Sequence, residues 1–285
     1  MAIEYITKDW LPVDLTLERR TPSVRWIAFG SKRLSEPFFS QSVEALRRAD
    51  PDIGEMETSL EDMLEIGSRL QPVTPAGFIF HISRCGSTLV ANAFRTAEAS
   101  IVISEAPVMT KLLFPHSAGL WPWCAAEWSE LSKALIDAML RIVGNHGRCD
   151  GQRVIIKLTS WNLIEWRVIR ALWPKVPALV IIRDPIYIIA SHMRSPGAFM
   201  RFSGSIKQAL FGVDQSDMSA HEYCARALGC LCASAHSMID DSTQVLMYED
   251  ITSKSLRDQA RRFGIDLRID SMALQRVDVR TILFN

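Results

Sequence analysis

Residues 77–88 read GFIFHISRCGST, a short apolar run followed by a turn of small residues and the start of a helical pattern. The apolar run has the length of a buried strand, and the serine and glycine residues after it are typical of a tight turn. A turn between a strand and a helix exposes backbone N–H groups at the positive end of the helix dipole. Residues 83–88 are therefore a candidate anion site, and Arg84 adds a positive charge to it.

Beyond this turn, short apolar runs alternate with longer helical patterns. The strands that we expect are residues 77–82, 101–104, 153–158, 177–182 and 244–248. The helices that we expect are residues 87–97, 106–113, 124–144, 161–172, 185–194, 219–239 and 252–263. Such an alternation is typical of βαβ units. The sequence therefore predicts an α/β fold with a central, mostly parallel sheet flanked by helices.

The first part of the chain has a different pattern. Prolines divide residues 1–75 into short pieces, with one candidate strand at 24–29 and candidate helices at 38–48 and 56–70. We therefore expect an N-terminal appendage over residues 1–75. The α/β domain is expected over residues 76–285.

The charge balance is even, because Lys plus Arg and Asp plus Glu both number 32 in 285 residues. A general nucleic-acid binder carries an extended basic field, so no nucleic acid is expected as a partner. The N-terminus has charges where a signal peptide is apolar, and no later run has the length of a membrane span. We therefore expect a cytoplasmic protein without a membrane partner. The six cysteines form no C-x-x-C pair, and no cluster of ligands predicts a metal site.

Two other chemistries fit the loop at residues 83–88 less well. A Walker A loop requires Lys after its second glycine, where this chain has Ser87. A phosphatase loop that begins at Cys85 requires Arg at position 91, where this chain has Ala91. A serine-capped helix without a ligand is the structural alternative.

A second candidate anion site follows the expected strand at 177–182. This strand leads into Arg183-Asp184-Pro185, and the next helix carries Ser191. Open α/β sheets bind their ligands at the carboxyl ends of parallel strands. Two anion sites at neighbouring strand ends predict a ligand with phosphates at two places. The alternative is that Arg183 and Asp184 pair with each other on the surface.

Together, the two segments resemble the cytosolic and tyrosylprotein-type sulfotransferases, which use 3′-phosphoadenosine 5′-phosphosulfate. The family motifs read Lys/Arg-Ser/Thr-Gly-Ser/Thr-Thr and Arg-Asp/Asn-Pro-x5-Ser. They are matched by Arg84, Gly86, Ser87 and Thr88, with Cys85 in place of the usual Ser, and by Arg183, Asp184, Pro185 and Ser191. The resemblance covers about residues 77–265 and implies a P-loop-like, three-layer domain. It implies that the first loop binds the 5′-phosphosulfate and that Arg183 and Ser191 bind the 3′-phosphate.

The resemblance also implies catalytic roles. Glu105 follows the second strand, where tyrosylprotein-type and many bacterial members carry a catalytic carboxylate that takes a proton from the acceptor. Lys157 ends the third strand, where relatives carry a Lys that offsets negative charge on the leaving phosphate, and Arg84 lies in the same catalytic group. The alternatives are a carboxylate that stabilises the next helix for Glu105, and a lysine that reaches toward solvent for Lys157.

Three further features bear on this resemblance. Tyr248 lies in a Tyr-Glu-Asp segment similar to one that shapes the cofactor pocket in the family. His116 is the alternative base. Residues 264–285 lack the glycine-rich segment with which many cytosolic members wrap the 3′-phosphate, which moves the likeness toward the tyrosylprotein-type and bacterial branches.

The sequence thus predicts a sulfotransferase that moves a sulfuryl group, in line and without a metal, to a hydroxyl or amine. The product of the donor is 3′-phosphoadenosine 5′-phosphate, and the acceptor is a small molecule or a peptide. The N-terminal appendage over residues 1–75 is a candidate contributor to the acceptor pocket. Residues 195–218 have no clear period and are long for a connection, so we expect a lid or substrate loop there. The alternatives are a small-molecule P-loop kinase that uses ATP and Mg²⁺, and a degenerate, non-catalytic nucleotide-binding protein. The sequence leaves the acceptor and the oligomeric state open.

Overall fold

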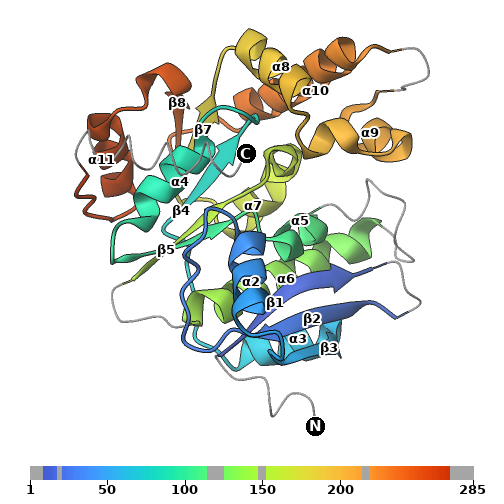
Figure 1. The fold of residues 1–285 in the computed structure, drawn as a ribbon, viewed down its shortest axis with the longest axis vertical. Helices are drawn as coiled ribbons and strands as arrows, with labels where there is room; N and C mark the ends of the chain where they lie inside the picture. Colours follow the sequence, from blue (N-terminus) through green and yellow to red (C-terminus); the bar gives the residue numbers. More distant parts are fainter. Residues whose placement is uncertain (1–8, 18–20, 114–124, 147–151, 214–217, 270–285) are drawn as a thin grey trace.

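A computed structural model of the chain contains two β-sheets with helices packed against them (Figure 1). It describes residues 9–17, 21–113, 125–146, 152–213 and 218–269.

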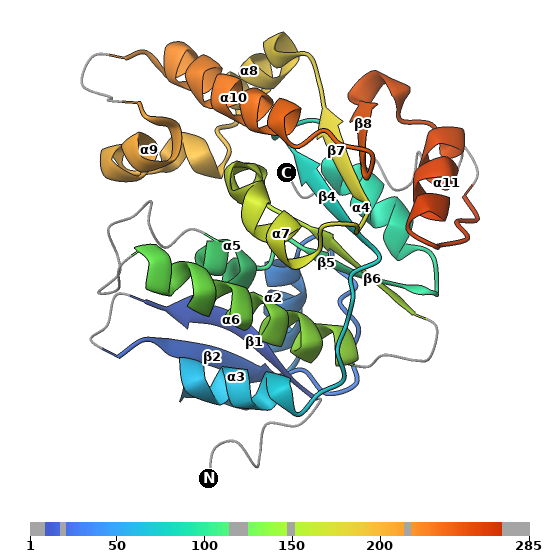
Figure 2. The same ribbon diagram turned by 180° about the vertical axis from the view of Figure 1, so that it is seen from behind.

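The larger sheet has five parallel strands in the order β5-β6-β4-β7-β8. These strands are β4 (Gly77–His81), β5 (Ser100–Ser104), β6 (Arg153–Lys157), β7 (Ala178–Ile182) and β8 (Thr243–Met247). The central strand β4 is buried along its whole length, as expected for a near-continuous apolar run with helices on both faces. Helix α4 lies in front of the sheet in Figure 1, and α7 lies in front of it in Figure 2. The predicted α/β fold with a parallel central sheet is confirmed.

Most helices of this part lie close to where the sequence predicts them. The helices are α4 (Ser87–Arg95), α5 (Pro107–Leu113), α6 (Ala125–Asn145), α7 (Trp166–Leu172), α8 (Pro185–Arg194), α9 (Gly204–Phe211), α10 (Ala220–Ser237) and α11 (Ser253–Arg262), with 3-10 helices η1 (Ser160–Glu165), η2 (Ala198–Arg201) and η3 (Tyr248–Asp250). Of these, η2 and α9 lie in the segment at 195–218, where no helix was expected. The helix expected at 161–172 begins as η1, where the Asn162 side chain accepts the Thr159 N–H at 3.2 Å. Within the described residues, no helix is long and apolar enough to cross a bilayer.

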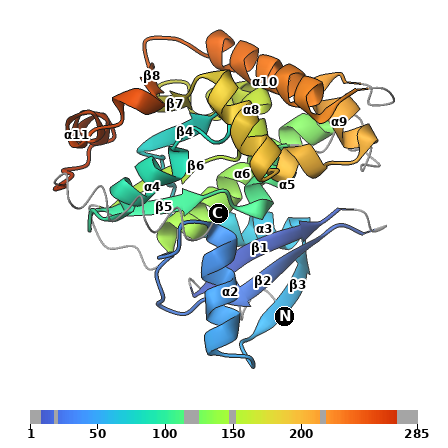
Figure 3. The ribbon, with the colours of Figure 1, turned by 45° about the horizontal axis from the view of Figure 1, so that its top comes forward.

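The smaller sheet is antiparallel and precedes the larger one in the chain. Its strands are β1 (Trp10–Thr16), β2 (Ser23–Ala28) and β3 (Glu55–Ser59), and its helices are α2 (Phe39–Ala49) and α3 (Leu60–Ser68). Helix α2 covers one face of this sheet, and α3 and α6 cover the other (Figures 1 and 2). Helices α5 and α6 lie between this sheet and the rest of the molecule (Figure 3).

The prediction of a helix at 56–70 is wrong in its first part, because residues 55–59 form strand β3. Strand β3 pairs with β2, and the Trp26 indole N–H donates to Thr58 Oγ1 at 2.9 Å in a buried contact. The helix then begins after Ser59, which forms a capping box with Asp62. Pairing with a distant strand therefore outweighs the local helical pattern. Strand β1 was not expected either.

The two sheets share one continuous apolar core, with Trp26 buried on one side and Phe80 on the other. The division of the chain at residue 75 stays a prediction. The described part of the predicted lid, residues 195–213, contains η2 and α9. It is held against α10, because the buried Tyr223 hydroxyl donates to the Phe199 carbonyl at 2.8 Å.

Candidate functional site

The predicted site residues follow the carboxyl ends of the parallel strands. The residues that end or follow β5, β6, β4, β7 and β8 are Glu105, Lys157, Arg84, Arg183 and Tyr248. Because parallel strands end at the same edge of a sheet, the topology places all five residues along one edge.

The loop after β4 has an unusual backbone. Ser83 has φ 77°, Arg84 has φ 46° and Gly86 has φ 79°, all in the left-handed region. A Cβ atom at Gly86 would lie 2.8 Å from Tyr248 Cδ2, so this position requires glycine for both its conformation and its contacts. Helix α4 begins directly after Gly86, and the first N–H groups of a helix have no acceptor within it. The loop therefore offers backbone donors to an anion.

Backbone strain in the described residues is concentrated at this edge. The non-glycine residues with positive φ are Ser83, Arg84 and Glu105, whose φ is 53°. Each such conformation costs on the order of 1–3 kcal/mol, and such residues gather at active sites and ligand clamps. The strain thus marks the ends of β4 and β5 as a candidate functional site.

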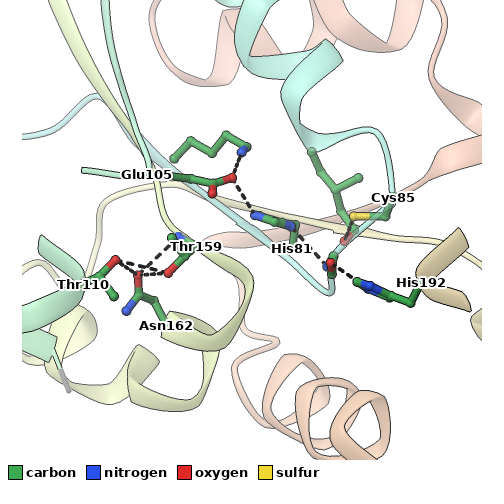
Figure 4. Close-up of polar contacts among 10 residues, drawn as sticks. His81, Cys85, Glu105, Thr110, Thr159, Asn162 and His192 are labelled. Atoms are coloured by element: carbon green, nitrogen blue, oxygen red, sulfur yellow. Dashed lines mark hydrogen bonds and ion pairs between the residues drawn. The ribbon is translucent and has the colours of Figure 1, made fainter. Parts of the chain in front are cut away.

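Glu105 and Lys157 form an ion pair in which the lysine is buried and the carboxylate is half-buried. The Lys157 side chain is fully buried, and its Nζ donates to Glu105 Oε1. The Glu105 N–H donates to the Lys157 carbonyl at 2.8 Å, which holds the two strand ends together. His81 Nε2 lies 3.5 Å from the same Oε1 atom (Figure 4). Lys157 therefore does not reach toward solvent, which rules out that alternative for it.

The protonation state of His81 follows from its hydrogen bonds. The Ser83 N–H donates to His81 Nδ1 at 3.1 Å, so Nδ1 carries no proton. Burial and the charge of Lys157 lower the pKa of His81, which favours the neutral ring. A neutral ring then carries its proton on Nε2, which faces Glu105.

The pKa of Glu105 depends on opposing effects. Burial alone raises the pKa, but the charge of Lys157 and the contacts with His81 outweigh it and lower the pKa to about 2. The carboxylate is therefore ionised throughout the neutral range.

An N-terminal side chain reaches this ion pair. The Lys157 Nζ atom lies 5.1 Å from the ring centroid of Phe38, which precedes α2. A cation at this distance is attracted to the face of the ring. Phe38 was not identified from the sequence, because a lone aromatic residue before a helix carries no functional signal.

His192 links the loop to the predicted lid. The Gly197 N–H donates to His192 Nδ1 at 3.1 Å, and His192 Nε2 lies 3.1 Å from Ser83 Oγ (Figure 4). Because Nδ1 accepts, the neutral ring donates from Nε2 to Ser83. Burial and the charge of Arg84 lower the pKa of His192 to about 4. The sequence offered no partner for this histidine, since Ser83 is distant along the chain.

Arg84 and Arg183 meet at the loop. Arg84 Nη2 donates to the Ser195 carbonyl at 2.9 Å, and Arg183 Nη1 donates to the Arg84 carbonyl at 3.3 Å. Burial, with a smaller effect of Arg201, lowers the pKa of Arg84. Both predicted motifs therefore lie in direct contact.

Arg183 stacks on aromatic rings. Its guanidinium carbon lies 4.1 Å from the ring centroid of Tyr248 and 5.3 Å from that of Tyr187. Its Nε is buried and has no hydrogen-bond partner within the described parts of the chain. Asp184 instead caps α8 by accepting the Ile186 N–H at 2.9 Å. The surface pairing of Arg183 with Asp184 is not found among the described residues.

The remaining predicted residues lie nearby. The Cys85 thiol is fully buried and donates to the Ile181 carbonyl at 3.1 Å, and burial raises its pKa to about 12. It points into the core, so Cys85 offers a ligand only its backbone. Ser87 is buried and Thr88 is half-buried in the first turn of α4, and Ser191 is half-buried on α8.

The described residues do not test two further predictions, which concern the alternative base and the absence of a metal. His116, the alternative base, lies outside the described residues. In the parts of the chain that are described, no three His, Cys, Asp or Glu side chains gather as metal ligands would. A metal-independent reaction stays a prediction.

Comparison with known proteins identifies no relative by sequence: no family model and no curated protein matches the chain. Among solved structures, a sulfotransferase from Alicyclobacillus acidocaldarius is similar with a TM-score of 0.43 and 12% identity, covering 74% of this chain and 96% of its own. A sulfotransferase from Mycobacterium tuberculosis has a TM-score of 0.41 and 11% identity, covering 82% of this chain and 75% of its own. With TM-scores and identities this low, neither likeness assigns a function to this chain.

Proposed function

We propose that this protein is a sulfotransferase that moves a sulfuryl group from 3′-phosphoadenosine 5′-phosphosulfate to a hydroxyl or amine. The observation that supports the proposal is the contact between the two predicted anion-binding motifs, at the sheet edge that also carries the Glu105–Lys157 ion pair. Arg183 of the second motif donates to the backbone of Arg84 in the first, and both follow strands of the sheet that also carries Glu105 and Lys157.

The residues fit a donor with anionic groups at two places. The loop at Gly86 has backbone donors and the dipole of α4 for one group, and Arg183 has a buried Nε without a described partner for the other. Tyr248 contacts Gly86 and stacks on Arg183, so one ring spans both motifs. The bound donor would supply the sulfuryl group and a phosphate leaving group.

Glu105 is the proposed proton acceptor, although its low pKa makes it a weak base. A weak base suffices when the transition state is loose, as for phosphoryl transfer, because the attacking hydroxyl keeps its proton until late. Lys157 is the proposed stabiliser of negative charge on the leaving phosphate. An anion that drew Lys157 toward itself would remove the main cause of the low Glu105 pKa, so the same movement would make Glu105 more basic.

The rest of the proposal follows from the sequence. The acceptor would be a small molecule or a peptide, with no nucleic acid or membrane as partner, and the protein would work in the cytoplasm. Catalysis would depend on positioning and fixed charges, without a metal. Phe38 indicates that the N-terminal region reaches the reacting groups and would help to form the acceptor pocket.

Calorimetric titration tests the donor site. The ligands are 3′-phosphoadenosine 5′-phosphate without metal and ATP with Mg²⁺, and the proteins are the wild type, Arg183→Ala and Arg261→Ala. Arg261 is an exposed arginine on α11 that pairs with Asp258, so its variant is the control for loss of charge. We expect the bisphosphate to bind without metal and Arg183→Ala to weaken it about 10- to 150-fold, as for the loss of a hydrogen bond to a charged group.

Other outcomes would contradict the proposal. Binding of ATP with Mg²⁺ in preference to the bisphosphate would indicate a kinase. A non-catalytic nucleotide-binding protein would bind the bisphosphate but show no turnover on any acceptor. Its function would not be lost in Glu105→Gln.

A further inference from the structure

A cavity lies at the C-terminal end of α4, away from the phosphate loop at its N-terminal end. It has a volume of about 620 Å³, which lies in the range of ligand pockets. It is lined by the last turn of α4, the first residues of β5, the end of α6 and the segment at residues 32–37. Helix α4 runs from Ser87 at the loop to Arg95 at the cavity, about 12 Å along its axis at 1.5 Å per residue.

The lining of this cavity is cationic. Lys32, Arg33 and Arg95 contribute three positive charges, and Glu36 contributes one negative charge. The whole chain has a formal net charge of zero, so this concentration of cations is a local feature. Ile101 and Val143 are among the apolar residues that line the same space. The cavity therefore combines a positive group with an apolar wall.

Arg95 is the charged group that most needs a partner. Its Nη1 donates to Asn92 on the same helix, while its Nε is buried and has no hydrogen-bond partner among the residues that are described. Among the described residues no ion pair of Arg95 is found, and the charge of Glu36 acts on it only from farther away. Burial lowers the pKa of Arg95 to about 10, so the side chain is still charged at neutral pH. The charge of the Arg95 guanidinium is therefore not offset by a neighbouring carboxylate, and an anion in the cavity would pair with it.

We propose that this cavity is a binding site for a small organic anion with an apolar body, whose carboxylate, sulfate or phosphate group pairs with Arg95. The site is separate from the proposed donor site, since the two lie at opposite ends of α4, and it does not depend on the sulfotransferase proposal. Lys32 and Arg33, both exposed, attract the anion at the entrance.

The probe for this site is 4-phenylbutyrate, and its neutral amide, 4-phenylbutanamide, is the matched control ligand. Both are titrated by calorimetry against the wild type, Arg95→Gln, Arg33→Gln and Arg261→Gln. The last variant removes an exposed arginine of α11 that pairs with Asp258 and does not line the cavity. Arg33→Gln changes an exposed side chain, so it tests the site even if Arg95→Gln does not fold.

We expect the carboxylate to bind at least tenfold more tightly than the amide. Arg95→Gln should weaken its binding at least tenfold, Arg33→Gln by a smaller factor, and Arg261→Gln not at all. Prior saturation with 3′-phosphoadenosine 5′-phosphate should leave the probe's affinity unchanged. The proposal is overturned if the carboxylate does not bind the wild type, if acid and amide bind equally, if Arg95→Gln and Arg33→Gln bind like the wild type, or if the bisphosphate displaces the probe.

Discussion

The interior and the surface parts of the candidate site differ in whether their charged side chains have partners of opposite charge. In the interior part, Lys157 is fully buried and pairs with Glu105, whose side chain is 22% exposed. In the surface part, Arg183 stacks on Tyr248 and Tyr187 and has no carboxylate partner in the described structure. The interior charges therefore stabilise each other, whereas the surface cation is left for a ligand.

This difference separates two roles that a sequence motif cannot distinguish. Loss of a buried charge leaves its partner uncompensated and destabilises the fold. Loss of a half-exposed cation that faces rings changes ligand binding more than stability. Changes in the interior part should therefore appear in unfolding experiments, and changes in the surface part should appear in titrations.

The largest expected effect is that of Lys157→Met. It leaves Glu105 without its cation in a buried environment, so the free energy of unfolding should fall by about 3–5 kcal/mol, measured by urea denaturation. Adding Glu105→Gln should recover part of this loss. Lys175→Met, at an exposed position, is the control and should change stability by less than about 0.5 kcal/mol. An equal effect of both lysine variants would show that the ion pair contributes nothing.

The pH dependence of stability should show two separate windows. The pKa of His192 is lowered from 6.5 to about 4, so its contribution is fully present above about pH 6.5 and is lost as the pH falls to about 4. The pKa of Glu105 is lowered from 4.5 to about 2, so its contribution is present above about pH 4.5 and is lost toward about pH 2. The Glu105 effect is on the order of 3 kcal/mol.

Urea denaturation across this pH range checks both windows. His192→Gln should reduce the dependence of the unfolding free energy on pH in the upper range. His81 also contributes in this range, because its pKa is lowered as well. Glu105→Gln should reduce the dependence in the lower range. If the free energy of unfolding of Glu105→Gln still falls below pH 4.5 as steeply as that of the wild type, the neighbours of the carboxylate do not keep it ionised.

A smaller effect is expected for Tyr248→Leu, which removes the ring nearest to Arg183. Loss of a cation–π contact worth about 0.5–1 kcal/mol should weaken binding of 3′-phosphoadenosine 5′-phosphate about two- to fivefold in a calorimetric titration. Tyr187→Leu is the matched control, because its ring is farther from Arg183 and 56% exposed. A larger effect of Tyr187→Leu would mean that Tyr187, and not Tyr248, makes the main contact with Arg183.

The smallest effect is expected for Cys85→Ser. The thiol donates to the Ile181 carbonyl in the core, and a hydroxyl can do the same, so stability should change by less than about 1 kcal/mol. Affinity for the bisphosphate should change less than about twofold, because the side chain points away from the loop. A tenfold gain in affinity would mean that residue 85 faces the ligand.

The sequence predicted the larger sheet well and the smaller sheet poorly. Four of the five parallel strands are largely buried apolar runs bounded by turns, and such patterns are readable within a few residues. The fifth, β8, is an edge strand in which Val245 and Met247 are exposed, but its apolar residues still mark it as a strand. Strand β3 reads locally as part of a helix, and only its pairing with β2 and the contact of Thr58 with Trp26 make it a strand. Strand preference depends on such partners more than helix preference does.

What the sequence by itself determined is the α/β fold and the position of Glu105, Lys157, Arg84 and Arg183 after apolar strands. These features depend on residues that are close together in the chain. Only the tertiary structure decided that Glu105 pairs with Lys157, 52 residues away, and that His192 bonds to Ser83, 109 residues away. The charge state of each group depends on these partners and on burial, and both arise only when the strands and helices pack together.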